Sequence, residues 1–353
     1  MFDKSVFKEI INVLQDEKNR KIALLPHVFP DGDAWGSSFA LAEWITHEFD
    51  GKTVDVISET NIPKHFEKFL ARDSSSKFNI VDLNFVEDPD SYDIVVAVDC
   101  PSFQKIYEKF HHIFKGNPVK PVTIDIDHHV TNYGVSSIKC IDRKASSAGM
   151  VVYSLICSLN RDAINTFIAE CLYVSLVSDT GFFSFANATA ETLHVASDLA
   201  FKCNICEIGA LLRDYTHELL NLMGEALHNI RYYDINGYKV AVCPVTETHF
   251  LESGAARAHS EKIFEVLKKC RESEIIVMAY IDESNRVKIG INSENTQFRD
   301  LKSPFLVADF ATEFGGAGHP FAAGFRAKIK EGAEDPVEDL LAVVLDKIEK
   351  LTK

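Results

Sequence analysis

The chain has no long apolar run. Nowhere in its 353 residues does a stretch approach the ~18 uninterrupted apolar residues that a membrane-spanning helix needs. The first residues, Met1 to Ser5, do not join a basic segment to an apolar one as a secretory signal does. Internal repeats and low-complexity segments are also missing. We therefore expect a cytoplasmic protein with no membrane partner.

Positive charge is scarce as well. The chain has 37 Lys and Arg against 52 Asp and Glu, a formal net charge of −15 at pH 7. Nonspecific binding of duplex nucleic acid depends on many Lys and Arg contacts with phosphates. This balance disfavours long duplex nucleic acid and long polyphosphate chains as partners. A small or very short anionic substrate remains compatible with it, because bound metal ions reverse the local field.

The eight cysteines are scattered, and several lie inside apolar runs. That pattern is typical of buried thiols in a reducing compartment. The one close pair, Cys203 and Cys206, has no second Cys or His pair at the spacing of a zinc site, which disfavours a metal role for it.

The first half of the chain alternates apolar runs rich in Val and Ile with amphipathic helical patterns. Its predicted strands are residues 22–26, 54–57, 79–81, 94–98 and 122–126, and its predicted helices include residues 39–49 and 103–114. This alternation is typical of an α/β fold with a mostly parallel sheet and helices on both faces. We assign residues 1–190 to this domain.

The second half has a different pattern. Asn236-Gly237 between two apolar segments predicts a tight hairpin, and residues 275–281 with 287–291 predict another. We expect a smaller α+β domain over residues 231–353. A helical connector, residues 191–230, is expected to join the two domains.

Two helix starts are predicted in the second half. Ser260 is of a type that caps helices, and Asp335-Pro336 places proline at the first helical position, where it is tolerated. Both sites suit the expected α+β domain.

Three short stretches rich in Asp and His each follow a predicted strand directly. Because the carboxyl ends of parallel strands meet at one edge of the sheet, these side chains should converge there. Hard divalent cations prefer carboxylate oxygen and imidazole nitrogen. A further acidic residue follows an apolar helix. The candidate ligands are His27, Asp31, Asp33, Asp99, Asp127, His128, His129 and Asp179.

Each acidic position also has a structural interpretation. Asp33 could simply cap the helix that follows it, and Asp99 or Asp179 could be turn residues. A capping role for Asp33 would not explain why His27 and Asp31 are present in the same loop. Four of the carboxylates, at positions 31, 33, 99 and 179, carry four negative charges that two divalent cations would neutralise. Two such ions lower the pKa of a bridging water and clamp phosphoryl oxygens.

A glycine-rich segment near the C-terminus is a second candidate site. Residues 314–324 include Gly316, Gly318 and His319. Glycines let backbone N–H groups approach an anion closely, and the histidine adds a donor. The alternative interpretation is a flexible turn with a surface histidine.

These motifs together resemble the DHH phosphoesterase family. The pattern His27-x-x-Pro30-Asp31-Gly32-Asp33, then Asp99, Asp127-His128-His129, Asp179 and Gly-Gly-Ala-Gly-His, has the family's order over nearly the whole chain. It is similar to two-domain bacterial and archaeal members that act as nanoRNases, 3′-phosphoadenosine 5′-phosphate phosphatases and cyclic dinucleotide phosphodiesterases.

The resemblance implies two bound divalent metal ions, most often Mn²⁺, and a role for each motif residue. One ion would be held by His27, Asp31 and Asp99, and the other by Asp33, Asp99, His128 and Asp179. Catalytic roles would fall to Asp99, to His129 beside the scissile phosphate and to Asp127, which orients a histidine. The implied substrate contacts are Asn132, Ser147, Gly316, Gly318 and His319.

Two positions depart from the family pattern. Ala317 stands where the family usually has the middle glycine of Gly-Gly-Gly-His, and Asn292 stands where relatives often carry an arginine. An arginine can grip a nucleotide phosphate bidentately, which asparagine cannot do. Arg257, Lys288 or Arg299 could compensate, and the sequence does not choose among them.

We therefore predict a Mn²⁺-dependent phosphodiesterase that hydrolyses short single-stranded oligonucleotides, with 3′-phosphoadenosine 5′-phosphate as a further candidate substrate. The alternatives are a cyclic dinucleotide phosphodiesterase, a polyphosphate or pyrophosphate hydrolase of the same fold, and a nucleotide-binding regulator without turnover. A homodimer is compatible with each of them.

Overall fold

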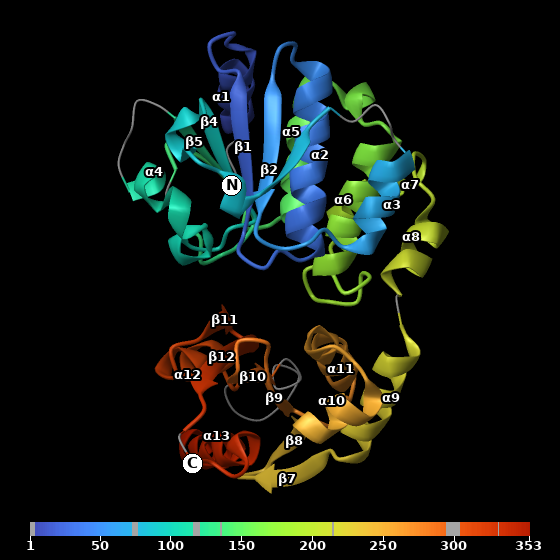
Figure 1. Ribbon diagram of the computed structural model, residues 1–353. Coiled ribbons are helices and arrows are strands. Elements are labelled where there is room, and N and C mark those ends of the chain that lie inside the picture. The colour runs from blue at the N-terminus through green and yellow to red at the C-terminus, as the bar shows by residue number, and fades with distance from the viewer. Residues whose placement is uncertain are drawn as a thin grey trace. The chain divides into compact units, whose positions relative to one another are not determined.

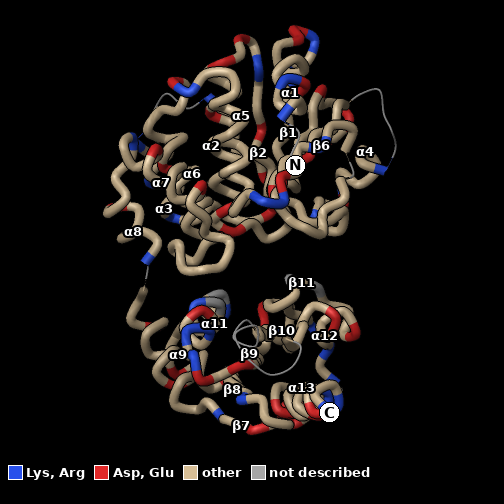
Figure 2. The backbone as a smooth tube through the Cα atoms, turned by 180° about the vertical axis from the view of Figure 1, so that it is seen from behind, with Lys and Arg blue, Asp and Glu red and all other residues tan. Residues whose placement is uncertain are grey.

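The computed structural model describes residues 4–72, 77–115, 121–134, 136–213, 215–293, 304–330 and 332–353. The chain divides into two compact units, Met1–Arg213 and Asp214–Lys353 (Figure 1). Among the helices that the structure describes, none has the length and apolar character needed to cross a membrane. Figure 2 shows Lys and Arg positions interspersed with Asp and Glu positions along both units.

The first unit is built on a parallel sheet of six strands. Their order across the sheet is β3-β2-β1-β4-β5-β6, and every neighbouring pair is parallel. The α/β fold predicted from the sequence is thus confirmed, with β6 as an unpredicted sixth strand. The strands are β1 (Lys21–Pro26), β2 (Thr53–Ser58), β3 (Asn79–Asp82), β4 (Ile94–Val98), β5 (Val122–Asp127) and β6 (Ile138–Ile141).

The strand order reverses between β1 and β4. From β1 the chain builds outward through β2 and β3 on one side, and then returns to place β4 on the other side of β1. In open α/β sheets a crevice forms at such a reversal, outside the carboxyl ends of the two strands. The loops after β1 and β4 therefore emerge where ligands bind in folds of this kind.

Both faces of this sheet are covered. Alternate strand residues face opposite ways, so Ile22 and Leu24 join the core under α1, α2, α5 and α6, while Ala23 and Leu25 pack with α4 and the short helical turns near it. The helices of this unit are α1 (Ser5–Gln15), α2 (Gly32–Glu48), α3 (Lys64–Arg72), α4 (His111–Lys115), α5 (Ala148–Leu159), α6 (Thr166–Asp179), α7 (Ala190–Ala200) and α8 (Ile205–Leu212).

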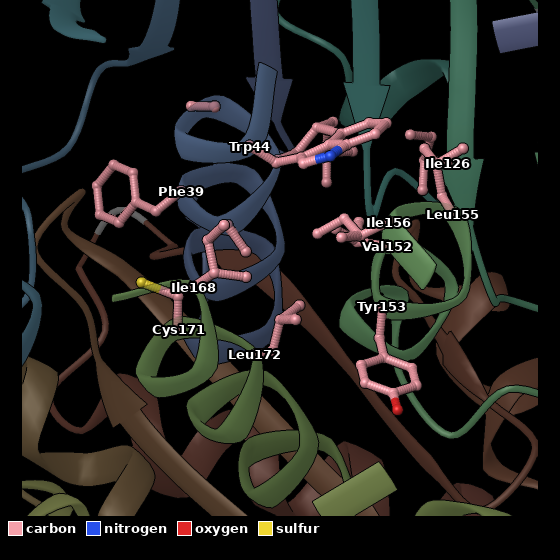
Figure 3. Packing of buried hydrophobic residues seen from close by; sticks show 14 of the residues in the cluster. Phe39, Trp44, Ile126, Val152, Tyr153, Leu155, Ile156, Ile168, Cys171 and Leu172 are labelled. Atoms are coloured by element: carbon pink, nitrogen blue, oxygen red, sulfur yellow. The ribbon is translucent and has the colours of Figure 1, made fainter. Parts of the chain in front are cut away.

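The larger core of the first unit centres on α2. Figure 3 shows side chains from α2, α5, α6 and β5 meeting in it, among them the fully buried Trp44 of α2. Helices α2 and α6 approach very closely, since a Cβ at Gly36 would stand 2.4 Å from the Cys171 carbonyl oxygen. This contact fixes the first turns of α2, where Asp33 lies, against the middle of α6.

The second unit contains a mixed sheet of six strands in the order β11-β12-β10-β9-β8-β7. Strands β8 and β9 are parallel and the other neighbours are antiparallel. Both predicted hairpins are confirmed, β7 with β8 and β9 with β10. The strands are β7 (Arg231–Ile235), β8 (Tyr238–Val245), β9 (Ile275–Ile281), β10 (Arg286–Asn292), β11 (Ala317–His319) and β12 (Ala322–Lys328).

Helices cover both faces of the second sheet too. Helices α12 and α13 pack on one face, and α9, α10 and α11 on the other. Asp335 caps α13 and Pro336 opens it, as predicted. The helices are α9 (His217–His228), α10 (Glu247–Ser253), α11 (Ser260–Leu267), α12 (Val307–Glu313) and α13 (Pro336–Thr352).

Two local predictions are wrong. The helix predicted over residues 103–114 is replaced by two short 3₁₀ turns, 103–105 and 108–110, followed by α4. The backbone is extended at Ile106, and the Lys105 carbonyl accepts a hydrogen bond from Val28 N–H at 2.9 Å. Ser260 does not cap α11, because it is the first helical residue and lies buried.

The segment expected as a connector contains three helices. Residues of α7 and α8 belong to the core of the first unit, whereas residues of α9 belong to a core of the second. The division between the units falls after Arg213.

Candidate metal and phosphoester site

The three motifs meet at the strand reversal. The segment with His27 and Asp31 follows β1, and Asp99 follows β4. Asp99 has a left-handed backbone with φ of 56°, and its N–H donates to the Ile126 carbonyl on β5 at 2.9 Å. The Asp99 side chain is 2% exposed and lies between His27 and His128.

Asp99 faces one histidine with each of its carboxylate oxygens. Its Oδ2 lies 3.8 Å from His27 Nε2, and its Oδ1 lies 3.5 Å from His128 Nε2. Asp31 Oδ1 stands 3.9 Å from His27 Nε2 on one side. On the other side, Asp33 Oδ2 and Asp179 Oδ2 stand 3.6 and 3.1 Å from His128 Nε2.

Two groups of possible ligands therefore share Asp99. One is His27, Asp31 and Asp99, and the other is Asp33, His128 and Asp179, with Asp99 beside it. Ligand atoms that each stand about 2.1 Å from one ion are on the order of 3–4 Å apart, which is the spacing found here. The structure thus brings together all six side chains that the resemblance assigned to metal.

Both imidazoles are oriented from behind by backbone carbonyls. His27 Nδ1 lies 2.8 Å from the Val28 carbonyl, and His128 Nδ1 lies 3.3 Å from the Ala145 carbonyl. A carbonyl at Nδ1 favours the tautomer with the proton there, leaving the Nε2 lone pair toward the carboxylates. This is the arrangement of metal-binding histidines.

Two buried atoms in the cluster have no hydrogen-bond partner among the described residues. They are Asp99 Oδ1 and His128 Nε2; the Asp179 carboxylate lies 3.1 Å from this nitrogen, but not in hydrogen-bond geometry. A buried polar atom without a partner is costly, and native structures seldom leave one unless water or an ion meets it. The donor set of carboxylate and imidazole fits a divalent cation at this place.

Asp33 does not cap α2, so that alternative interpretation is wrong. Asp31 takes the cap instead, with its Oδ1 accepting from Asp33 N–H and Ala34 N–H. The Asp33 carboxylate turns inward to the N-terminus of α5, where Ala148 N–H and Gly149 N–H donate to it at 2.7 and 3.1 Å. The positive end of a helix stabilises a carboxylate held there.

Ser175 completes the hold on Asp33 and was missed by sequence reasoning. Its hydroxyl donates to Asp33 Oδ1 at 2.6 Å from the middle of the apolar helix α6. Nothing in the pattern of α6 marks this serine as special. Ser175 can be connected with the site only together with Gly149. A Cβ at Gly149 would stand 2.0 Å from Ser175 Oγ, so the glycine leaves space for this hydroxyl.

The charges of the cluster shift its proton equilibria in the absence of metal. Burial, with the Asp179 carboxylate nearby, raises the pKa of Asp33 to about 7. Burial and the Asp33 carboxylate raise the pKa of Asp99 well above its usual range. Burial alone would lower the pKa of His128, but Asp179 and Asp99 outweigh it and raise that pKa well above its usual value. Metal binding must therefore displace protons.

Asp127 and His129 form a second layer beside the cluster. His129 Nδ1 lies 2.7 Å from Asp127 Oδ1 and 3.4 Å from Asp99 Oδ1. Burial would raise the pKa of Asp127, but hydrogen bonds with His129 and Asn132 lower it. The fully buried Asp127 therefore keeps its charge and orients His129.

Asn132 and Ser147 are both buried. Asn132 Nδ2 donates to Asp127 Oδ2 at 2.7 Å, and its Oδ1 accepts from Gly134 N–H. Ser147 is the cap of α5, and its Oγ accepts from Met150 N–H. The contacts that the structure describes for these two side chains are internal ones.

The glycine-rich segment of the second unit is packed tightly. Gly316 N–H donates to the Ala311 carbonyl at 2.8 Å, and a Cβ at Gly316 would stand 2.3 Å from the Gly324 carbonyl oxygen. At Gly318 a Cβ would stand 2.4 Å from the Ala322 carbonyl oxygen. These glycines are needed for the close approach of β11 and β12. The side chain of His319 lies outside what the structure describes.

The candidate basic replacements for an arginine at position 292 differ in their surroundings. Arg257 is paired with Glu247 and also donates to the Ile281 carbonyl. Lys288 stands over the Tyr280 ring at 5.6 Å. Arg299 lies outside the described residues. Asn292 itself is 3% exposed.

Residues 21–176 match the model of the DHH family, N-terminal domain. This region is a DHH-family domain. It contains five of the six clustered ligand candidates, and Asp179 lies three residues beyond its end. The family match and the cluster together support binding of divalent metal at this site.

Curated relatives match most of the chain. A protein of Thermus thermophilus named bifunctional oligoribonuclease and PAP phosphatase NrnA is 26% identical over 308 residues, which are 87% of this chain and 84% of that protein. A Bacillus subtilis protein of the same name is 23% identical over 308 residues, 86% of this chain and 88% of that protein. With the domain match, these relatives make the chain a hydrolase that acts on phosphate esters.

A solved structure shares the fold of the whole chain. It is the crystal structure of an exopolyphosphatase-related protein from Bacteroides fragilis, with a TM-score of 0.80 at 23% sequence identity. The similarity covers 99% of this chain and 98% of that one.

Proposed function

We propose that this protein is a Mn²⁺-dependent phosphodiesterase that hydrolyses short oligonucleotides, and that it also removes phosphate from 3′-phosphoadenosine 5′-phosphate. The observation that carries the proposal is the position of Asp99. Its two oxygens face His27 and His128 at 3.8 and 3.5 Å, so this one buried carboxylate would supply a ligand to each of the two groups. The names of the curated relatives supply the substrate class.

The proposed ligands are the six clustered side chains, His27, Asp31, Asp33, Asp99, His128 and Asp179. Their four carboxylates would balance the charge of two divalent cations. When bound, such a pair supplies an acidified water as nucleophile and positive charge for the phosphoryl oxygens. The choice of Mn²⁺ rests on the resemblance to the family and on a donor set of oxygen and nitrogen. The neighbouring thiol of Cys100 donates to the Leu25 carbonyl and lies outside the donor set.

His129 and Asp127 have supporting roles in this proposal. The charged Asp127 accepts the Nδ1 proton of His129 and fixes the orientation of the ring. The ring is thereby held beside Asp99, next to the position of the reacting phosphate, where it can donate to an oxygen of that phosphate or to the leaving oxygen. Asn132 and Ser147 act from behind the site, by holding Asp127 and by capping α5.

The substrate is proposed to be short and single-stranded. A net charge of −15 and the mixture of acidic and basic positions over both units disfavour long duplex nucleic acid (Figure 2). We assign residues 231–353 as a substrate-binding domain that selects one end of the substrate, with Gly316, Gly318 and His319 near that end. None of the eight cysteines forms a disulfide, as suits the cytoplasm.

An activity panel tests the proposal. The purified chain, loaded with Mn²⁺, should hydrolyse a diribonucleotide and other RNAs of up to about five residues, and release phosphate from 3′-phosphoadenosine 5′-phosphate. Cyclic di-AMP, inorganic pyrophosphate and polyphosphate should react more slowly, because they lack a free nucleotide end. Faster turnover of one of these three would replace the proposed substrate. No turnover of any substrate, with metal bound, would favour a nucleotide-binding regulator.

A further inference from the structure

Exposed aromatic side chains stand at the edge of the metal-ligand cluster. Phe29 lies between His27 and Asp31 in the sequence and is 66% exposed. Phe182 lies three residues after Asp179 and is 50% exposed. Neither ring belongs to one of the buried hydrophobic cores.

The backbone at both rings is strained. Six residues other than glycine have positive φ among those that the structure describes, and two of them are asparagines in hairpin turns, where this conformation is common. The other four all lie at the cluster, and three are phenylalanines. A bulky side chain in the left-handed region costs free energy, and such strain gathers at ligand-binding sites. These four are Phe29 (φ 58°), Asp99 (φ 56°), Phe182 (φ 55°) and Phe183 (φ 62°).

The two exposed rings stand on segments that pack against each other. A Cβ at Gly32 would lie 2.4 Å from Ser178 Oγ, so the loop that carries Phe29 rests on the end of α6. The chain continues from there into a tight turn, in which Phe182 N–H donates to the Val177 carbonyl at 2.8 Å. Phe29 and Phe182 are thus carried by two backbone segments that contact each other beside the proposed ligands.

We propose that Phe29 and Phe182 form a stacking platform for a nucleobase of the substrate. This inference rests on the proposed phosphodiesterase function and deepens it. A base stands one sugar away from the phosphate to which it is linked, and these rings stand at the rim of the cluster that would hold that phosphate. Stacking on an aromatic ring accepts any base, because every base has a π-face. It also needs no positive charge, which this acidic chain has little of.

The platform would make Phe29 and Phe182 specificity-determining residues. A nucleotide gains stacking energy from them, whereas pyrophosphate and polyphosphate gain none. The preference for nucleotides would then arise in the first unit, next to the metal cluster.

A binding measurement tests the platform without turnover. A diribonucleotide that contains 2-aminopurine loses fluorescence when this base stacks on an aromatic ring, and the full chain should quench it in the presence of Ca²⁺ as a non-catalytic ion. Phe29→Ala and Phe182→Ala should each weaken binding by about 5- to 100-fold, the range measured for loss of one stacking ring. Phe29→Tyr should retain wild-type binding. Phe85→Ala removes a ring that is 79% exposed outside the site and should change nothing.

A hydrolysis measurement separates stacking from support of the metal loop. In Mn²⁺, Phe29→Ala should raise KM for the diribonucleotide by a similar factor and leave hydrolysis of a dinucleotide with two abasic riboses at its wild-type rate. An equal loss on the abasic substrate would overturn the proposal, since the ring would then act only by positioning the loop. Unchanged binding in both alanine variants would overturn it as well.

The two proposals can fail separately. If the wild-type chain does not hydrolyse the diribonucleotide but quenches the 2-aminopurine and loses this quenching in Phe29→Ala, the proposed function fails and the platform stands. If the wild-type chain hydrolyses the diribonucleotide without quenching, the platform fails and the function stands.

Discussion

The DHH-family site and the glycine-rich segment were both predicted from short motifs, yet they behave differently in the structure. In the first, Asp99 Oδ1 and His128 Nε2 are buried without a hydrogen-bond partner among the described residues. In the second, Gly316 N–H is already bonded within the fold, and the missing side chain makes room for a neighbouring strand. The buried carboxylate and imidazole in the first site are accounted for by a bound ion. The glycines in the second are accounted for by close packing of the strands, whether or not they also contact a ligand.

The largest expected effect belongs to the bridging carboxylate. Asp99→Ala should lower Mn²⁺-dependent hydrolysis of a diribonucleotide by at least about 10³-fold, because both proposed ion sites lose a ligand. His128→Ala should have an effect of the same order. The matched control is Asp82→Ala, since Asp82 is an exposed carboxylate at the end of β3 in the same sheet. Activity near wild type in the Asp99 variant would contradict the claim that the cluster, unlike the glycine-rich segment, needs a bound metal ion.

Substitution in the glycine-rich segment should mainly lower the stability of the second unit. Gly316→Ala forces a Cβ to within 2.3 Å of the Gly324 carbonyl oxygen, so the free energy of unfolding of the second unit should fall by about 1–3 kcal/mol. Hydrogen exchange on peptides from β10 and β12 measures this loss. Gly224→Ala is the control, because it lies in α9 with nothing within 4 Å of its Cβ and should stabilise that helix by up to about 1 kcal/mol. Lost substrate binding with unchanged exchange would instead make the segment an anion site.

The stability of the metal-free first unit should also depend on pH. Asp33, with a pKa raised to about 7, keeps its proton in the native state at pH values where the unfolded chain has lost it. Asp99 and His128 are shifted in the same direction. Through Asp33 and Asp99 the native state therefore binds more protons above about pH 4, and through His128 it does so only above about pH 6.5. Its stability should fall as the pH rises above about pH 4, by about 1.4 kcal/mol per pH unit for each extra proton.

The second unit should not share this slope. Burial would raise the pKa of Asp282, but hydrogen bonds with Ser284 and Arg326 outweigh it and lower that pKa. The stability that Asp282 contributes is therefore present above about pH 4 and is lost only below it. Hydrogen exchange at pH 5 and pH 7.5 on peptides from β4 and from β9 compares the two units in one sample. Saturating Mn²⁺ should abolish the slope in β4. Parallel slopes in both units would show that the metal-ligand cluster is not its source.

The sequence predicted the sheet and the ligands because their signals are local. Strands β1 and β4 are continuous apolar runs, as parallel strands buried on both faces must be, and the charged residues that end them have no place in a core. The helix predicted over residues 103–114 failed for a reason that lies elsewhere in the chain. Its apolar spacing is helical, but Lys105 pairs with the loop after β1, and Tyr107 bonds to Ser58.

The parts of the site that could not be predicted all depend on tertiary contact. Ser175 donates to Asp33 across 142 positions of sequence, and no local pattern marks it. Phe29 and Phe182 look like ordinary apolar residues until their exposure and left-handed backbone are known. The glycine motif has two interpretations that the sequence alone does not separate, because a requirement for close packing has the same sequence as an anion-binding loop.

The amount of manganese bound per chain tests the central claim most directly. After saturation with Mn²⁺ and dialysis, elemental analysis should find two ions in the wild-type chain and fewer than one in Asp99→Ala, with the fold of the variant verified by circular dichroism. One ion or none in the wild type, or two ions retained in the variant, would contradict a pair of sites joined by that carboxylate.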